Sequence, residues 1–102
     1  MNESPIFVRT HDLLLWLIPL TVKFPRQQRF VMAAALQREA FAVQEFLFHA
    51  LLRADVALAQ VRSHFRLSHQ MEMLSAGQYA HGAKLIDEVG CLLGAWLKGK
   101  AE

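Results

Sequence analysis

The chain has 102 residues, a length that allows one domain (residues 1–102) with one modest core and excludes two. Its single cysteine, Cys91, excludes an internal disulfide and a zinc site built from cysteines. The net charge of +2, with a pI near 9.0, is too mild a basic bias to establish nucleic-acid binding, so the placement of the cations must decide that question.

Apolar residues are more abundant than so small a domain can bury. They make up 54% of the sequence, and the mean hydropathy is +0.21. Because a small domain has little interior volume, we expect a second chain to cover the excess apolar surface. Only three prolines and five glycines are present, and no Asn-Gly or Asp-Gly hairpin signal occurs. The sequence therefore predicts an all-α fold.

The first helix is predicted over about residues 11–23, with Thr10 as its N-cap and a kink at Pro19. All six residues from 13 to 18 are apolar, so this helix must be covered on more than one side. Its apolar run, LLLWLIPL at 13–20, is shorter than the roughly 18 residues of a membrane span. The polar, acidic start MNESPIF does not fit a secretory signal, so we expect a cytoplasmic protein.

The second helix is predicted over about residues 26–52, with Pro25 at or near its first position. Gln37 and Gln44 lie within its wide apolar face, where core amides with hydrogen-bond partners are favoured over binding groups. Two adjoining apolar stripes make up that face: Phe30, Ala34, Phe41 and Phe48, and Leu36, Ala40, Val43, Leu47 and Leu51.

A third helix is predicted over about residues 55–73, after a break within LLRADVAL that no glycine or proline marks. Its inward residues should be Val56, Leu58, Val61 and Phe65. A fourth helix is predicted over about 76–98, because Ser75 and Gln78 have the spacing of a capping box. Its buried face should comprise Leu85, Ile86, Val89, Leu92, Leu93 and Trp96.

Gly90 and Gly94 lie four residues apart within the fourth helix and suggest a place where another backbone comes close. Short connections between the four predicted helices favour an up-down-up-down four-helix bundle.

Signatures of enzymes are absent from the sequence. It contains no GxSxG, P-loop, glycine-rich dinucleotide turn or HExxH motif. His64 and His69 are five residues apart, so a metal site is not expected, and Cys91 is interpreted as a small buried hydrophobe. Neither catalytic residues nor a cofactor are predicted.

The cations are better organised than the acids. Arg62 and Arg66 lie one turn apart with no acid three or four residues away in their helix, so they need a carboxylate of another helix or a phosphate. Arg26 and Arg29 follow Lys23 at the start of the second helix, where a phosphate and a bundle carboxylate are equally favoured.

Two motifs resemble the accessory variability determinant (Avd) proteins of diversity-generating retroelements. They are LLLWLIPLTVKFPRQQRF at 13–30 and LIDEVGCLLGAWLK at 85–98, with a looser match through Arg62 and Arg66 between them. The proteins encoded in intervening sequences of bacterial ribosomal RNA genes share the bundle with that family. The resemblance implies a four-helix protomer that assembles into a homopentameric ring or barrel with a basic surface.

The resemblance also implies a function. The partners would be a reverse transcriptase and an RNA that carries the template repeat, and the protein would support mutagenic cDNA synthesis and retrohoming without catalytic residues of its own. The nucleic-acid-binding residues would be Lys23, Arg26, Arg29, Arg62 and Arg66. The chain departs from the family in a short connection between the second and third helices and in Cys91, which replaces a frequent basic residue. The alternative is a structural helical oligomer or protein-interaction module without nucleic-acid binding.

Overall fold

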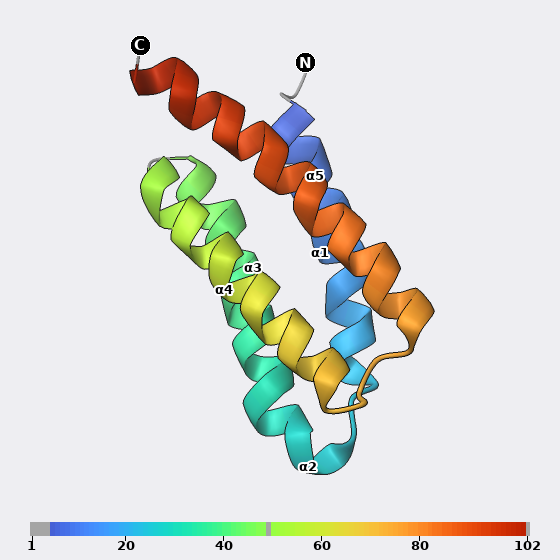
Figure 1. The fold of residues 1–102 in the computed structure, drawn as a ribbon. Coiled ribbons are helices and arrows are strands. Elements are labelled where there is room, and N and C mark those ends of the chain that lie inside the picture. The colour runs from blue at the N-terminus through green and yellow to red at the C-terminus, as the bar shows by residue number, and fades with distance from the viewer. Residues whose placement is uncertain (1–4, 49, 102) are drawn as a thin grey trace.

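The structure, a computed structural model, describes residues 5–48 and 50–101. All regular secondary structure in this part of the chain is helical, as the sequence predicts. The elements are α1 (Pro5–Val22), α2 (Arg26–Gln28), the π-helical segment η1 (Arg29–Ala33), α3 (Ala34–Leu47), α4 (Leu51–Gln70) and α5 (Ala76–Ala101). The four long helices alternate in direction and form a four-helix bundle (Figure 1).

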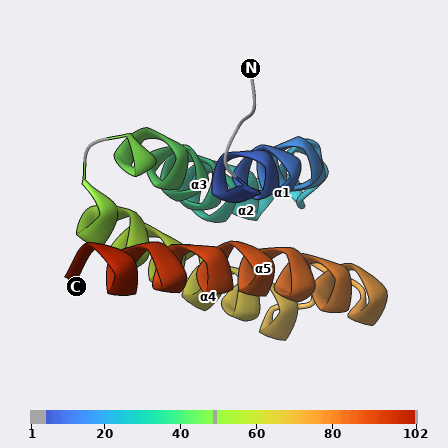
Figure 2. The same ribbon diagram turned by 90° about the horizontal axis from the view of Figure 1, so that it is seen from above.

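The bundle has two layers, one of α1 with α3 and one of α4 with α5 (Figure 2). Each long helix packs against the next one along the chain, and α5 returns to α1. One hydrophobic core lies between the layers. Its largest fully buried side chains are Phe24, Phe65, Ile6, Leu13, Leu17, Leu36, Leu58, Ile86, Leu93, Val43, Val61 and Val89.

Helix α1 begins at Pro5, six residues before the predicted start, so the prediction of Thr10 as an N-cap is wrong. Proline suits the first helical position because its missing N–H has no partner to lose there. Thr10 is buried inside the helix, where its Oγ1 donates a hydrogen bond to the carbonyl of Ile6 at 2.7 Å. Pro19 lies within the helix.

Helix α1 is long and apolar enough to cross a membrane by length and composition, with a mean hydropathy of 1.2 over 18 residues. The apolar run at 13–20, taken by itself, is too short for a span. One third of the 18 residues are buried inside the bundle, and core helices of globular proteins meet the same criterion.

The predicted second helix is divided and ends early. It comprises α2, η1 and α3, and it stops at Leu47 rather than at residue 52. Ala50, with φ of −158° and ψ of 71°, departs from helical geometry, and α4 starts at Leu51 instead of residue 55. Without a glycine or proline the sequence does not mark this boundary.

In α4 the residues Leu58, Val61 and Phe65 are buried as predicted, but Val56 is 59% exposed. Val56 precedes Val61 by five residues, which places it about 140° away from Val61 around the helix. The prediction that Val56 belongs to the core is therefore wrong.

Helix α5 starts at Ala76 as predicted, and its capping box forms. The backbone N–H of Gln78 donates to Ser75 Oγ at 3.1 Å, and the N–H of Ser75 donates to Gln78 Oε1 at 2.9 Å. Of the predicted face, Ile86, Val89 and Leu93 are buried, and the other three residues pack against the core.

The expectation of close packing at both helix glycines holds at one of them. A Cβ on Gly90 would lie 3.1 Å from Arg62 Nη2 on α4, whereas nothing described lies within 4 Å of such an atom on Gly94. Cys91 is exposed, so its interpretation as a buried hydrophobe is wrong. Gln37 is a satisfied amide as predicted, since its Nε2 donates to Thr21 Oγ1 at 2.8 Å.

Candidate nucleic-acid interface

Two of the predicted cations flank the turn between α1 and α2. The backbone N–H of Lys23 donates to the Leu20 carbonyl at 3.1 Å, and that of Phe24 donates to the Thr21 carbonyl at 3.2 Å. The Phe24 side chain is buried, which anchors the turn, while the side chains of Lys23 and Arg26 are exposed. The turn therefore presents two cations on a fixed backbone.

The π-helical segment η1 follows this turn directly. Such segments are rare and often occur at functional sites, because they displace the side chains that follow. Arg29 belongs to η1, but its side chain lies outside the part of the chain that the structure describes.

The two α4 arginines have different surroundings. Arg62 Nη2 lies 3.3 Å from Asp87 Oδ1 on α5, so a carboxylate of another helix supplies the anion that the sequence required. Both side chains are largely exposed, and pairs of this kind contribute about 0–1 kcal/mol. Arg66 is exposed and forms no ion pair with another described residue.

The cations gather toward one end of the bundle but not on one helix. Figure 1 shows α2 and the C-terminal end of α4 at the same end. Lys23 and Arg26 belong to the layer of α1 and α3, whereas Arg62 and Arg66 belong to the layer of α4 and α5 (Figure 2). An anion at this end would meet Lys23, Arg26 and Arg66 without a competing described carboxylate partner, and Arg62 only in competition with Asp87.

The sequence analysis missed a buried polar pair between α3 and α4. Glu39 is buried, and its Oε1 lies 2.7 Å from His64 Nδ1. A signal was present, because Glu39 is three residues after Leu36 and four before Val43, on the stripe that faces the core. One turn beyond, the ring of His69 stacks on Tyr79 with 4.3 Å between centroids.

These described groups do not form a metal-binding site. In the described ranges, no three His, Cys, Asp or Glu residues lie close enough together to hold an ion. The Glu39–His64 pair instead acts as a polar link that holds α3 against α4.

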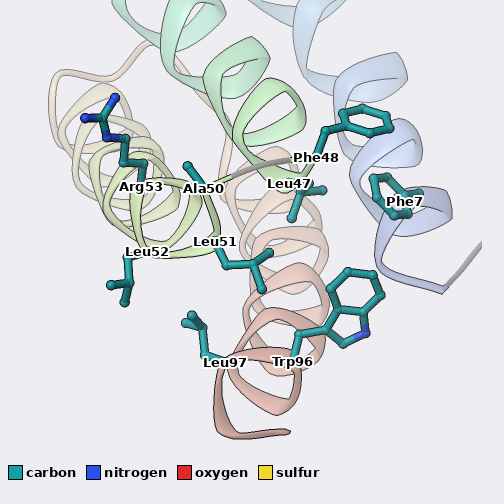
Figure 3. A pocket seen from close by; sticks show the side chains of 9 residues that line it. All are labelled: Phe7, Leu47, Phe48, Ala50, Leu51, Leu52, Arg53, Trp96 and Leu97. Carbon is teal, nitrogen blue, oxygen red and sulfur yellow. The ribbon is translucent and has the colours of Figure 1, made fainter. Parts of the chain in front are cut away.

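An apolar pocket of about 670 Å³ opens at the end of the bundle opposite the cations. Figure 3 shows the guanidinium of Arg53 directed away from Leu51, Leu97 and Trp96, and its Cζ lies 5.9 Å from the centre of the Phe46 ring. The pocket is lined by Phe7, Leu47, Phe48, Ala50, Leu51, Leu52, Arg53, Trp96 and Leu97. Among these described side chains no set of polar groups converges on the space, so this pocket lacks the arrangement that would orient a substrate.

A second hollow of about 670 Å³ lies between α1 and α5. Arg9 and Lys84 line it together with Asp87 and Glu88, so opposite charges are interspersed there. This mixture contributes no net basic field, and the exposed Cys91 that also lines the hollow belongs to no described group of three metal-ligating residues.

No protein-family model matches the chain, and no curated protein matches it either. The resemblance to Avd proteins therefore rests on the two sequence motifs. The first motif runs from α1 through the turn that carries Lys23 and Arg26 into η1, and the second lies within α5.

Proposed function

We propose that this protein is a non-catalytic, cytoplasmic accessory subunit that binds RNA as a homo-oligomer. As the Avd resemblance implies, its partners would be a reverse transcriptase and the retroelement RNA, and its role would be to support mutagenic cDNA synthesis and retrohoming. The observation that carries the proposal is the group of exposed cations Lys23, Arg26 and Arg66 at one end of the bundle.

Assembly into an oligomer raises the total positive charge that is available to bind RNA, although each chain is only weakly charged. One chain carries a net charge of +2, so the five chains of the implied pentamer carry five times +2, or +10. The potential near the cationic ends rises with this total, and each phosphate that a cation neutralises releases counterions from the RNA. Affinity should consequently fall steeply as salt is added.

The test is the affinity for a structured RNA, measured by fluorescence anisotropy at several salt concentrations. We expect Lys23→Ala with Arg26→Ala, and separately Arg66→Ala, to weaken binding and to reduce the salt slope by about one for each phosphate that is no longer neutralised. Lys98→Ala is the matched control, since Lys98 is exposed on α5 far from the cationic end. An equal loss of affinity in the control, or binding that ignores salt, would refute the proposal.

A second candidate function is a structural oligomer or protein-interaction module without RNA binding. The observation that favours it is the set of large apolar side chains exposed on α1 and α3. In that case the arginines pair with carboxylates of neighbouring subunits, so the same substitutions should dissociate the oligomer in the absence of RNA. Light scattering without RNA separates the two candidates.

A further inference from the structure

Two exposed apolar stripes run along the outer surface of the α1 and α3 layer. On α1, the residues Val8, Leu15 and Val22 are 39%, 62% and 55% exposed. They are seven residues apart, and seven residues fall about 20° short of two full helical turns, so the three side chains form one line. Ala34 and Phe41 on α3 and Phe48, the C-cap residue of α3, have the same spacing, and the two phenylalanines are 52% and 69% exposed.

Contacts between the two helices set these stripes side by side. Near one end, the rings of Phe7 and Phe48 have centroids 4.9 Å apart. Near the other end, Gln37 Nε2 bonds to Thr21 Oγ1 at 2.8 Å. Because α1 and α3 are antiparallel, these contacts put Val8 level with Phe48, Leu15 level with Phe41, and Val22 level with Ala34. These six residues are called the α1–α3 face below.

We propose that the α1–α3 face binds the same face of a second copy of this chain. The two-fold axis would lie in the interface, across the helices at the level of Leu15 and Phe41. With this axis each helix lies antiparallel on its counterpart in the other copy, and both copies contribute the same surface, which makes the contact isologous. The inference goes beyond RNA binding and does not depend on it.

The sizes of the side chains agree with this axis. A two-fold rotation at the level of Phe41 sets Phe48 of one copy against Ala34 of the other, so a large ring meets a small side chain twice. On α1 the same rotation sets Val8 against Val22, which are of equal size. The pairs away from the axis are thus complementary in size, while Phe41 and Leu15 each meet their own copy on the axis.

The charged residues beside the α1–α3 face are also consistent with the proposed axis. Arg38 and Glu45 are exposed on the outer side of α3, and neither forms an ion pair with another described residue. They are seven residues apart, about 10.5 Å along the helix, too far to pair within one chain. The proposed axis brings Arg38 to the partner's Glu45 and Glu45 to the partner's Arg38. Such pairs at the edge of an apolar contact fix its register and its choice of partner.

The apolar area exposed on the α1–α3 face is large enough for a dimer interface of modest size. With about 200 Å² for each phenylalanine and less for leucine and valine, the five large residues of the face expose on the order of 500 Å² per chain. The polar residues beside them bring the contact toward the roughly 800 Å² per partner of a standard interface. A single copy would leave this area in water.

Charge reversal tests the proposal. Arg38→Glu and Glu45→Arg each place like charges across the axis, so each variant should have half the wild-type mass in analytical ultracentrifugation without RNA. The double variant should regain the wild-type mass. An equimolar mixture of the two single variants should regain it too, since their charges complement each other. Lys84→Glu, an equal reversal at an exposed site on α5, should leave the mass unchanged.

Phe41→Ser provides an independent arm, because it removes apolar surface from the interface without altering charge. It should also halve the mass while circular dichroism shows a folded bundle. The wild-type particle should contain an even number of chains: two for an isolated pair, or ten where two five-membered rings pair. A wild-type particle with an odd number of chains would overturn the proposal. So would single reversals that leave the mass unchanged, or single reversals whose mixture does not reassociate.

Discussion

Gly82 on α5 is buried where three helices meet. A Cβ at this position would overlap the ring of Phe65 and lie 2.8 Å from Trp16 Cζ3. We therefore expect Gly82→Ala to lower the free energy of unfolding by about 1–3 kcal/mol, the usual cost of overpacking a core. Urea unfolding at a fixed protein concentration measures the change.

Gly94 on the same helix is the matched control. Nothing described lies within 4 Å of a Cβ built there, so Gly94→Ala should raise the free energy of unfolding by about 0.5–1 kcal/mol through the backbone entropy of glycine. Equal effects at Gly82 and Gly94 would contradict the packing described here.

Glu39 depends on His64 for a hydrogen-bond partner inside the bundle. Glu39→Ala removes the carboxylate and leaves His64 Nδ1 without its partner on α3, so we expect a loss of about 1–3 kcal/mol in the free energy of unfolding. Glu39→Gln retains an acceptor oxygen and should cost less. Asp55→Ala, at an exposed carboxylate on α4, should change stability little. If it equals Glu39→Ala in cost, the pair contributes nothing specific.

At the scale of helices, the sequence predicted the two starts that carry a chemical signal, whereas it missed the starts of α1 and α4 by six and four residues. Pro25 and the Ser75–Gln78 box both mark real boundaries, because each satisfies or removes backbone N–H groups that a helix start leaves unpaired. The end of α3 carries no such chemistry. Tertiary packing placed that break several residues before the predicted one, and the predicted N-cap at Thr10 fell within a helix that starts at Pro5.

The capping box can be tested on its own. Ser75→Ala removes the acceptor of the Gln78 N–H bond, so the free energy of unfolding should fall by about 0.5–2 kcal/mol. Ser63→Ala is the same chemical change at an exposed position inside α4, where no cap is removed, and it should be nearly neutral. Thermal unfolding of both variants gives the comparison, and a smaller loss of stability for Ser75→Ala than for Ser63→Ala would contradict the cap.

For the whole molecule, composition predicted the surplus of apolar surface but not its location. Phe41 and Leu36 both lie on apolar stripes in the sequence, and only the packing of α3 against its neighbours decides that Leu36 is buried and Phe41 exposed. The cations show the same limit. Their identities could be read from the sequence, but the pairing of Arg62 with Asp87 depends on how α5 lies against α4.

Pairing of chains and RNA affinity should be linked through charge. Two paired chains carry twice +2, or +4, so Phe41→Ser, which separates them, should weaken RNA binding and reduce its salt dependence although no cation is removed. Anisotropy titrations of this variant beside the wild type measure the effect. An unchanged affinity at half the mass would contradict this link, because the unpaired particle would then bind RNA as tightly as the paired one.

Light scattering of the purified protein, with and without a structured RNA at low and high salt, tests the central claim most directly. The account predicts a particle with an even number of chains that takes up RNA at low salt and releases it at high salt. A particle that ignores RNA at every salt concentration would contradict the proposed function and favour the structural oligomer.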